Sequence, residues 1–593
     1  MIGTYAAVIV VCGASLALGR AAVAVCGYRR WSWLSPAVGL ALLCAVCWGT
    51  ARLPGHGVIS AIVVLLLVVA SIVYLWRRLE GGGEALGAGW PVALVALLAA
   101  SIPFVVEGHF GILGTSFNPD MSQHLLATAR LAHGHSSQLL VQGYPLGPHS
   151  VVVALNKGLG VGLVQGFSGL SVSVIVLAPL TALAAFAELK AIPRTAGALV
   201  VGCAYVPASY FAQGAFKETL EALFVLAFAL SLRETTRSGS DLPLRFVPAA
   251  LLAIGAVYVY SFPGLLWLIG TFVIWAIAEM LLGRSKLTCR PVLLALLVFL
   301  VLAAPEIGRM IDFHKFETFD PNGPGLGNLF GQVSPFEALG IWPSGDFRLA
   351  PGDGAVPAVG YYLGAAFALV LLLYGIARCR RRRESAVLAC LATAAIAYVA
   401  ARVAGTPYTA AKAIEVSAPL VALVILLPLL GEGDWRFIRR GADKSATRTI
   451  LDLAAVVFVL AAGVCSLLAL ANAPVGPTSY SPALTGLRPL VANDSTVVLA
   501  SPQLLADEHG APYIAWELRG GRVCIETEAE ADGKPPKGVR FVVTHGTPQQ
   551  PFPGLRARMV AAPYVLWEVT NPIAANSPCP LIAVRQARQG PAR

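Results

Sequence analysis

The chain has 593 residues, of which 57% are hydrophobic and only 13% are charged. Soluble domains usually carry about 25% charged residues, so this chain has about half of the usual share. The hydrophobic residues form many separate runs of about 17–25 residues, each long enough to cross a hydrocarbon core about 30 Å thick. This composition excludes a soluble enzyme, a disordered scaffold and a nucleic-acid-binding protein, and it predicts a polytopic membrane protein.

The net charge of +11, from 43 Lys and Arg against 32 Asp and Glu, does not indicate a nucleic-acid partner. The basic residues form short clusters beside the hydrophobic runs. The densest clusters are Arg29–Arg30, Arg77–Arg78, Arg378–Arg383 and Arg436–Arg440. Short basic loops at the ends of spans are typical of the cytoplasmic side, so the charge indicates topology in a lipid bilayer.

Hydropathy and charge together predict about 14 transmembrane helices. The predicted spans lie near 2–27, 33–52, 57–76, 88–106, 167–190, 195–212, 217–232, 245–260, 262–283, 291–308, 356–377, 385–403, 412–430 and 449–472. If the basic clusters lie inside, both the N-terminus and the chain after about residue 473 lie outside. We expect the first span to be an uncleaved anchor, because no basic segment precedes it and further spans follow directly.

One apolar segment, 149–164, is too short and too polar to count as a span. It contains Asn156, Lys157 and several glycines, and counting it would place the Arg378–Arg383 cluster outside. We therefore expect a re-entrant or surface-lying helix within a long outer loop from 107 to 166. A second outer loop, 309–355, is rich in Gly and Pro.

The segment after residue 473 is predicted to be a small α/β domain on the outer face. Strand-like runs at 496–500, 539–543 and 564–569 alternate there with turn-rich and helix-like stretches. The predicted organisation is N-terminal transmembrane helices at 1–87, a transmembrane core at 88–472 and an extracytoplasmic α/β domain at 473–593.

Two of the eleven cysteines, Cys524 and Cys579, lie in this outer segment, and the other nine lie in spans or on the inner side. An even pair of cysteines in an oxidising compartment predicts a disulfide.

The first candidate functional residues are Asp120 and His124, early in the first outer loop. They lie at i and i+4 of a predicted helix, so they share one face of it. A carboxylate beside an imidazole suits general-base catalysis. Asp120 with Gln123 also matches a capping box, so a purely structural N-cap is the alternative.

Cations at the outer ends of spans form the second part of the candidate site. They are Lys217, Arg402 and Lys412, and Tyr408 shares a helix face with Lys412. Cations beside a carboxylate at the outer rim suit a lipid whose phosphate head group lies outside, and solvated loop charge is the alternative. The other candidates on the outer side are Glu107, Glu218, Asp346 and Arg348.

The arrangement resembles the GT-C superfamily of integral-membrane glycosyltransferases. The likeness rests on the long first outer loop with an acidic residue soon after a span, the many spans and the outward C-terminal domain. Asn118-Pro119-Asp120 with His124, and the segments 143–149, 214–218, 260–264 and 406–412, are similar to uncharacterised actinobacterial members. Members of the superfamily transfer a sugar from a polyprenyl-phosphate or polyprenyl-pyrophosphate donor on the non-cytoplasmic face.

The resemblance implies an inverting transferase of the plasma membrane with Asp120 as the base. The acceptor would be a cell-envelope glycan, lipid or protein, and the leaving lipid phosphate would contact Lys412, Arg402, Lys217 and Tyr408. Many members carry a DxD-like acidic pair that holds a divalent metal. Asp120 has no close acidic partner, because Glu107 is the only other acidic residue between Glu84 and Glu188. A role for Mg or Mn therefore stays open.

Three other functions remain alternatives. A transporter or flippase for a lipid-linked precursor usually shows repeated halves and polar groups near the midplane. Here no repeat is evident, and Arg20 is the main polar residue inside a span. An O-antigen-type polymerase or ligase would use the loop 309–355. A non-catalytic assembly protein would only present the C-terminal domain.

Overall fold

The structure is a computed structural model that describes residues 1–28, 30–76, 82–114, 120–238, 242–283, 289–314, 325–432, 446–507, 510–527, 537–546 and 549–572. The N-terminal and central part of the chain is helical. Its helices are α1 (Ile2–Val25), α2 (Ser35–Ala51), α3 (His56–Trp76), α4 (Gly82–Val106), α5 (Asp120–Leu131), α6 (Gln138–Val141), α7 (Gly147–Leu159), α8 (Leu163–Phe186), α9 (Ala191–Gly202), α10 (Tyr205–Ala212), α11 (Phe216–Ser238), α12 (Val247–Tyr260), α13 (Phe262–Leu281), α14 (Cys289–Ala303), η1 (Ala304–Glu306), α15 (Ile307–Phe313), η3 (Pro335–Leu339), α16 (Ala358–Arg381), α17 (Ser385–Ala404), α18 (Pro407–Glu432) and α19 (Ala446–Ala471).

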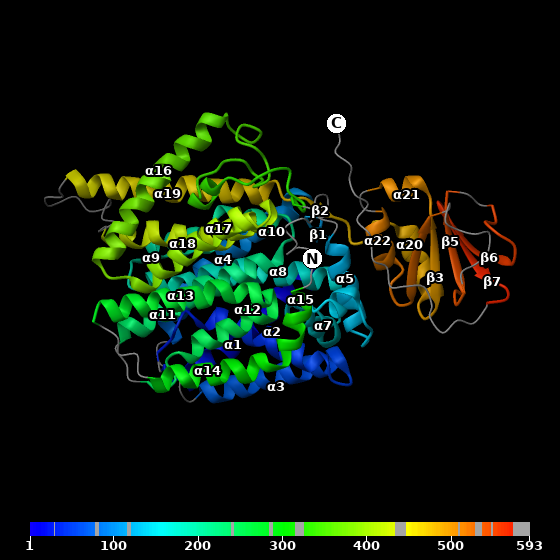
Figure 1. Cartoon of the computed structure of the whole chain (residues 1–593), viewed down its shortest axis with the longest axis horizontal. Coiled ribbons are helices and arrows are strands. Elements are labelled where there is room, and N and C mark those ends of the chain that lie inside the picture. Colours follow the sequence, from blue (N-terminus) through cyan, green and yellow to red (C-terminus); the bar gives the residue numbers. More distant parts are fainter. Residues whose placement is uncertain are drawn as a thin grey trace.

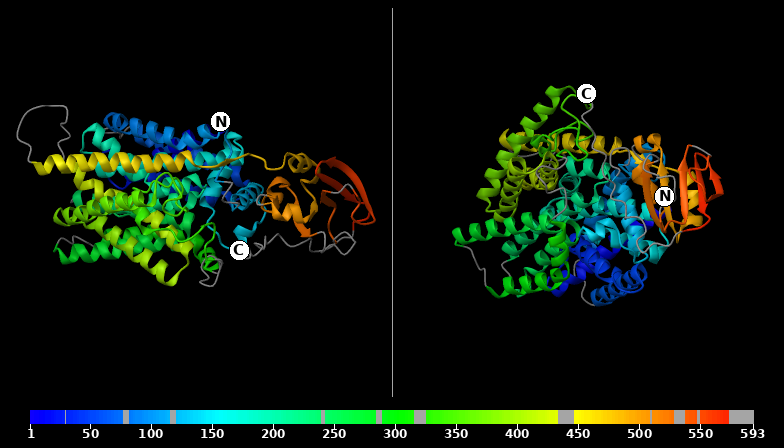
Figure 2. Two further views of the ribbon diagram at one scale, coloured as in Figure 1. Left: turned by 90° about the horizontal axis from the view of Figure 1, so that it is seen from above. Right: turned by 45° about the vertical axis from the view of Figure 1, so that its right-hand side comes forward.

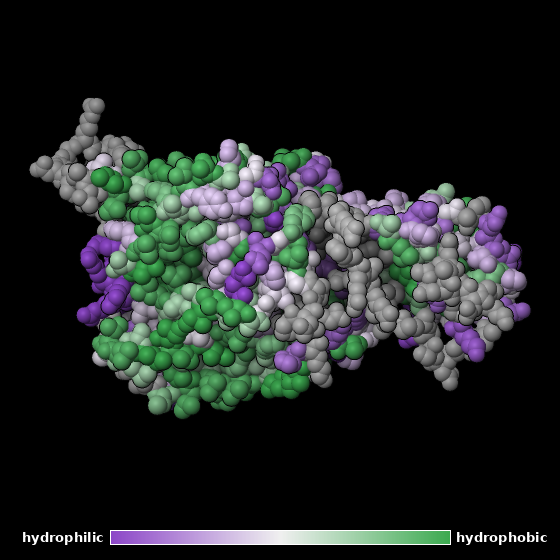
Figure 3. Space-filling model, turned by 45° about the horizontal axis from the view of Figure 1, so that its top comes forward, coloured by the Kyte–Doolittle hydropathy of each residue, from purple (hydrophilic) through white to green (hydrophobic). Residues whose placement is uncertain are grey.

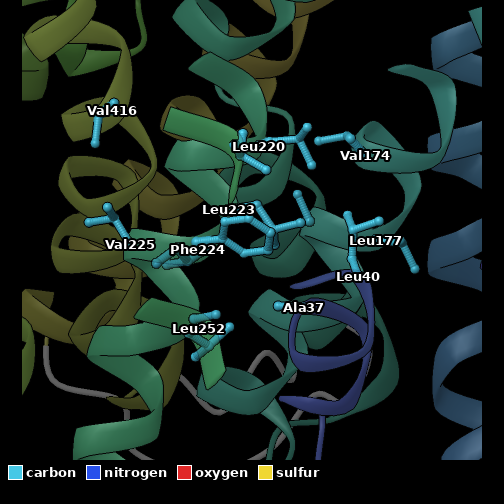
Figure 4. Packing of buried hydrophobic residues seen from close by; sticks show 14 of the residues in the cluster. Ala37, Leu40, Val174, Leu177, Leu220, Leu223, Phe224, Val225, Leu252 and Val416 are labelled. Atoms are coloured by element: carbon cyan, nitrogen blue, oxygen red, sulfur yellow. The ribbon is translucent and has the colours of Figure 1, made fainter. Parts of the chain in front are cut away.

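The long helices pack side by side in one bundle, and the C-terminal region lies beyond one end of it (Figures 1 and 2). Aliphatic and aromatic side chains fill the bundle, such as Leu220 and Phe224 of α11 beside Leu177 of α8 (Figure 4). The exterior is hydrophobic as well, and Figure 3 shows a broad hydrophobic surface over the bundle. A bundle that is apolar both inside and outside requires lipid around it.

Within the described residues, ten helices are long and apolar enough to cross a membrane, or eleven if the bent pair α9 and α10 counts as one span. All the predicted spans are helical, but α2 and α12 are shorter than the others and α11 carries charged residues at both ends. The chain is thus a multi-pass membrane protein of mainly helical fold, as predicted, and the count of about 14 spans stays a prediction.

The predicted span at 195–212 is broken between α9 and α10, which meet at 53°. Pro207 explains the break. It has no N–H to donate to the carbonyl of Cys203, four residues earlier, and its ring clashes with that carbonyl in a continuous helix.

Figure 3 shows a hydrophilic patch at the end of the bundle away from the C-terminal region. Arg380–Arg383 are exposed where α16 ends. Next to them, buried Glu384 forms ion pairs with Arg233 and Arg237 of α11, both at 2.7 Å. The predicted clusters at Arg77–Arg78 and Arg436–Arg440, and Arg29 of the first, lie outside the described residues.

The segment predicted to stay out of the membrane forms α7, which has 13 residues and is too short to span. It lies beside α5 at the bundle end that faces the C-terminal region (Figure 1).

The C-terminal region is a five-stranded sheet of order β4-β3-β5-β7-β6 with three helices. The strands β4, β3 and β5 are parallel, and β7 and β6 are antiparallel to their neighbours. Its elements are β2 (Val475–Gly476), α20 (Pro482–Val491), β3 (Ser495–Ala500), α21 (Pro502–Ala506), α22 (Gly510–Glu517), β4 (Arg522–Thr527), β5 (Phe541–His545), β6 (Leu555–Ala561) and β7 (Tyr564–Val569). The predicted α/β domain is confirmed, and its three expected strands correspond to β3, β5 and β7.

Strands β4 and β6 were not expected. The sequence of β6 has two arginines and its side chains are mostly exposed, so it lacks the apolar alternation that indicates a strand. Cys524 on β4 is disulfide-bonded. Its predicted partner, Cys579, lies outside the described residues.

Candidate active site

Helix α5 presents Asp120 at the bundle end that faces the C-terminal region. The helix begins at Asp120, where a negative charge is favourable beside the free N–H groups of the first turn. Asn118 and Pro119, which belong to the predicted motif, lie outside the described residues. Asp120 is partly buried, as expected for a group at the edge of a packed site.

Two lysines from separate helices approach this carboxylate. Lys217 is in the first turn of α11 and Lys412 is in the second turn of α18. Lys412 Nζ is 3.0 Å from Glu218 Oε1, so its charge is balanced by a buried carboxylate. Lys217 has no carboxylate within ion-pair distance in the described part of the chain, and its Nζ lies 4.0 Å from the centroid of the Tyr144 ring.

Aromatic rings separate and orient the two lysines. Tyr260 lies between them, with its ring centroid 5.8 Å from Lys217 Nζ and 5.9 Å from Lys412 Nζ. The ring of Tyr408 is 4.2 Å from Lys412 Nζ. An aromatic ring face attracts a lysine ammonium group but carries no net charge. The two lysines therefore keep their positive charge for an anionic ligand.

The pKa of Asp120 reflects these neighbours. Burial raises it above the usual value, the positive charges of Lys412 and Lys217 lower it, and the negative charge of Glu218 raises it. Asp120 therefore lies within the electrostatic field of both lysines. A carboxylate with a raised pKa is a stronger base than an exposed one, while the lysines favour its ionised form.

His124, the second predicted residue of α5, points to a different partner. Its Nδ1 is 3.1 Å from Nε2 of the fully buried His149 on α7, and its ring packs on Phe216. Burial and the charge of Lys217 lower its pKa to about 3. Burial also lowers the pKa of His149 well below the usual value. At neutral pH the pair is uncharged, with one ring donating to the other.

Four other predicted residues lie outside this cluster. Glu107 is exposed at the end of α4. Arg402 is exposed and donates to Gln332 Oε1 at 2.5 Å. Asp346 and Arg348 are buried and pair with each other at 2.5 Å. A charged residue at the outer end of a span is thus not enough to join the site.

The sequence did not single out several residues of the cluster. Tyr144, Tyr260 and His149 were within the noted motifs, but an aromatic residue in an apolar context carries no distinguishing signal.

Glu221 and Glu415 are fully buried, and none of their carboxylate oxygens has a hydrogen-bond partner in the described part of the chain. A sequence signal for both existed: Glu221 follows Glu218 by three residues and Glu415 follows Lys412 by three residues, so each lies on the same helix face as a charged residue of the cluster.

The residues do not fit a divalent metal site. Within the described ranges, no three His, Cys, Asp or Glu side chains are placed to share a metal ion. Among the described residues, the charged groups that shift the pKa of Asp120 are two lysines, which repel a metal ion, and Glu218, which is already paired with Lys412.

No known family profile matches the sequence, and no curated protein matches it. Solved structures do resemble the chain. Arabinofuranosyltransferase AftD from Mycobacteria has a TM-score of 0.51 and 15% identity, over 82% of this chain and 40% of that chain. A mutant of AftD gives 0.50 and 14%, over 81% and 41%.

The archaeal oligosaccharyltransferase AglB from Archaeoglobus fulgidus, solved with an inhibitory peptide and a dolichol-phosphate, gives a TM-score of 0.46 at 13% identity, over 77% of this chain and 69% of that chain. This chain spans about two fifths of the length of AftD. The chain therefore shares the fold of AftD, in agreement with the GT-C-like fold that the sequence predicted.

Proposed function

We propose that the protein is a membrane glycosyltransferase that uses a lipid-phosphate-linked sugar as its donor. The observation that carries the proposal is that Lys217 and Lys412, from two different helices, both lie near enough to Asp120 to lower its pKa, at one end of a GT-C-like bundle. A base and two cations are the groups that glycosyl transfer from a phosphate needs. The likeness to AftD, an arabinofuranosyltransferase, supports the same class of reaction.

In the proposed reaction Asp120 takes the proton from an acceptor hydroxyl. The hydroxyl oxygen attacks the anomeric carbon from the face opposite the phosphate, and the bond between that carbon and the phosphate oxygen breaks. The electron pair of that bond leaves with the lipid phosphate. The anomeric configuration is inverted, because a single displacement takes place.

The lysines stabilise the charge that develops on the leaving phosphate, which gains one negative charge as the bond breaks. Lys217 is the stronger candidate, since its charge is not offset by a carboxylate within ion-pair distance in the described part of the chain. Lys412 supplies a second, partly compensated charge, and Tyr408 donates a hydrogen bond to phosphate or sugar. The proposed phosphate site does not include Arg402, which is exposed and donates a hydrogen bond to Gln332.

The acceptor is proposed to be a cell-envelope glycan, lipid or protein on the outer face of the plasma membrane. The test uses the full chain in vesicles, with a panel of polyprenyl-phosphate-linked pentoses and hexoses and an envelope glycan acceptor. We expect release of the lipid phosphate together with a product of inverted anomeric configuration. A product of retained configuration would contradict the single displacement.

One observation favours a second candidate, translocation of a lipid-linked sugar. Glu221 and Glu415 are buried carboxyls inside the bundle without hydrogen-bond partners among the described residues, and such carboxyls are common at transport sites. The same vesicles separate the two functions. Movement of the donor between leaflets without breakage of the sugar–phosphate bond would favour translocation.

A further inference from the structure

The linker that leads into the C-terminal region is fastened to the segment that precedes Asp120. Strand β2 pairs with β1 (Ile112–Leu113), so that Leu113 lies opposite Val475. The N–H of Gly114 donates to the carbonyl of Pro474 at 2.8 Å. The approach is close: a Cβ atom on Gly111 would lie 1.8 Å from the carbonyl oxygen of Gly476.

A second contact joins the C-terminal region to the same helix. α22 packs on α5, and the two helices are neighbours in Figure 1. Tyr513 and Trp516 of α22 are 1% and 2% exposed. They belong to the buried hydrophobic cluster of the transmembrane bundle, together with Met121 and Leu125 of α5, rather than to the core of their own sheet.

The position of α22 is itself fixed by a buried carboxylate. Glu517 is 1% exposed. It accepts hydrogen bonds from the N–H of Tyr480 at 3.0 Å and from Ser479 at 3.2 Å, and it pairs with Arg488 at 3.4 Å. These bonds join α22 to the linker and to α20. Because these bonds fix α22 within the domain and α22 packs on α5, a shift of the domain would also move α5.

Tyr513 is also electrostatically close to the proposed base. Its ring packs on that of Tyr480 with centroids 4.4 Å apart. Burial raises the pKa of its phenol, and the negative charge of Asp120 raises it further. The titratable groups that interact electrostatically with Asp120 are Lys217 and Glu218 of α11, Lys412 and Tyr408 of α18, Tyr144, and Tyr513 of α22.

We propose that the C-terminal domain is a working part of the active site, in which Tyr513 and the β1–β2 pair hold α5 so that Asp120 faces the two lysines. The proposal rests on the proposed transferase function. Tyr513 is a positioning residue, because it acts through α5 and not on the substrate. The apolar contacts of a short helix fix its position only while their partners stay in place, and a displacement of about 1 Å at a reacting group can cost about 10²-fold in rate.

The test compares Tyr513→Leu with Tyr564→Leu in the full chain. Tyr564 is a buried tyrosine on β7 of the same domain, but it packs in that domain's own core. For Tyr513→Leu we expect kcat to fall about 10- to 100-fold with an unchanged donor KM. We also expect the acid limb of the pH–rate profile to move to higher pH, because a displaced Asp120 loses the influence of the lysines. Tyr564→Leu should keep the wild-type profile.

A second variant reaches the same helix from the other side. Gly111→Ala forces β1 away from β2 without touching α22, and the same fall in kcat and shift of the acid limb are expected. Wild-type profiles for both Tyr513→Leu and Gly111→Ala would overturn the proposal. Equal losses in Tyr513→Leu and Tyr564→Leu would overturn it too, since they would show that any damage to the domain lowers the rate.

Asp120→Asn, run alongside, separates this inference from the proposed function. If Asp120→Asn is inactive while Tyr513→Leu and Gly111→Ala behave as wild type, only the positioning role fails. If Asp120→Asn is as active as wild type, the proposed function fails and takes the positioning role with it.

Discussion

Asp120 and Lys217 belong to different helices, and the charge of one sets the proton affinity of the other. The positive charge of Lys217 lowers the pKa of Asp120. Lys217→Met removes that charge, so the pKa of Asp120 rises and the carboxylate loses its basic form at a higher pH. The acid limb of kcat/KM should therefore move to higher pH, and the donor KM should rise.

The matched control for this change is Lys157→Met, at an exposed lysine near the end of α7. It should leave the pH profile unchanged. An acid limb that stays in place or moves to lower pH in Lys217→Met would contradict the coupling.

The buried imidazole pair predicts a loss of stability in acid. His149 has a pKa well below the usual value in the folded chain, whereas in the unfolded chain it titrates near 6.5. Below about pH 6.5 the unfolded state binds the extra proton, so stability falls as pH falls. At pH 5 the loss for one such histidine is about 2 kcal/mol.

The measurement is the midpoint of thermal denaturation in detergent at pH 7 and pH 5. His149→Phe keeps the apolar packing and should reduce the difference between the two midpoints. An unchanged difference would show that His149 is not the titrating group.

The sequence predicted part of the site because charge is rare in this chain. Asp120, Lys217 and Lys412 stood out as ionisable residues at the ends of apolar runs. The same reasoning selected Arg402, because an exposed arginine and a buried one look alike in a sequence. Which of them meet depends on the packing of α5, α11 and α18, which no local pattern encodes.

At the scale of helices, α1 and α2 pack with their backbones in close contact. A Cβ atom on Gly39 would lie 1.7 Å from the carbonyl oxygen of Ser15, so the two backbones touch there. Small residues permit such contacts between membrane helices. Gly39→Val should separate α1 from α2 and lower stability by several kcal/mol, at the upper end of the about 1–3 kcal/mol usual for overpacking.

Gly13 on α1 provides the control, because nothing lies within 4 Å of the Cβ atom that it would gain. Gly13→Ala should keep the wild-type expression and melting midpoint. Equal behaviour of the two variants in a thermal denaturation assay would contradict the close packing of α1 on α2.

Hydropathy predicted where helices lie but not how each is interrupted. The predicted span 195–212 has the composition of one helix, and only the missing N–H of Pro207 divides it. The α/β domain was predicted from three apolar strands, whereas the side chains of β6 are mostly exposed, so composition does not reveal that it pairs with β7.

For the whole molecule, the charge pattern predicts that the C-terminal domain and α7 share the outer side and that the end of α16 lies inside. Single cysteines replacing Gly160, Asp353 and Arg382 in a background without other reactive thiols test this. A membrane-impermeant thiol reagent added to intact cells should label Gly160→Cys and Asp353→Cys but not Arg382→Cys. Labelling of Gly160→Cys only after lysis would show that α7 crosses the membrane.

The central claim is that Asp120 is the base of a sugar transfer, and Asp120→Asn tests it most directly. Asn has nearly the size of Asp and suits a helix start, so folding should be unaffected. In the vesicle transfer assay the rate should fall by about 10²–10⁴, the usual contribution of general-base catalysis, with an unchanged melting midpoint. Asp353→Asn, at an exposed acid, is the control. Transfer by Asp120→Asn at the wild-type rate would contradict the claim.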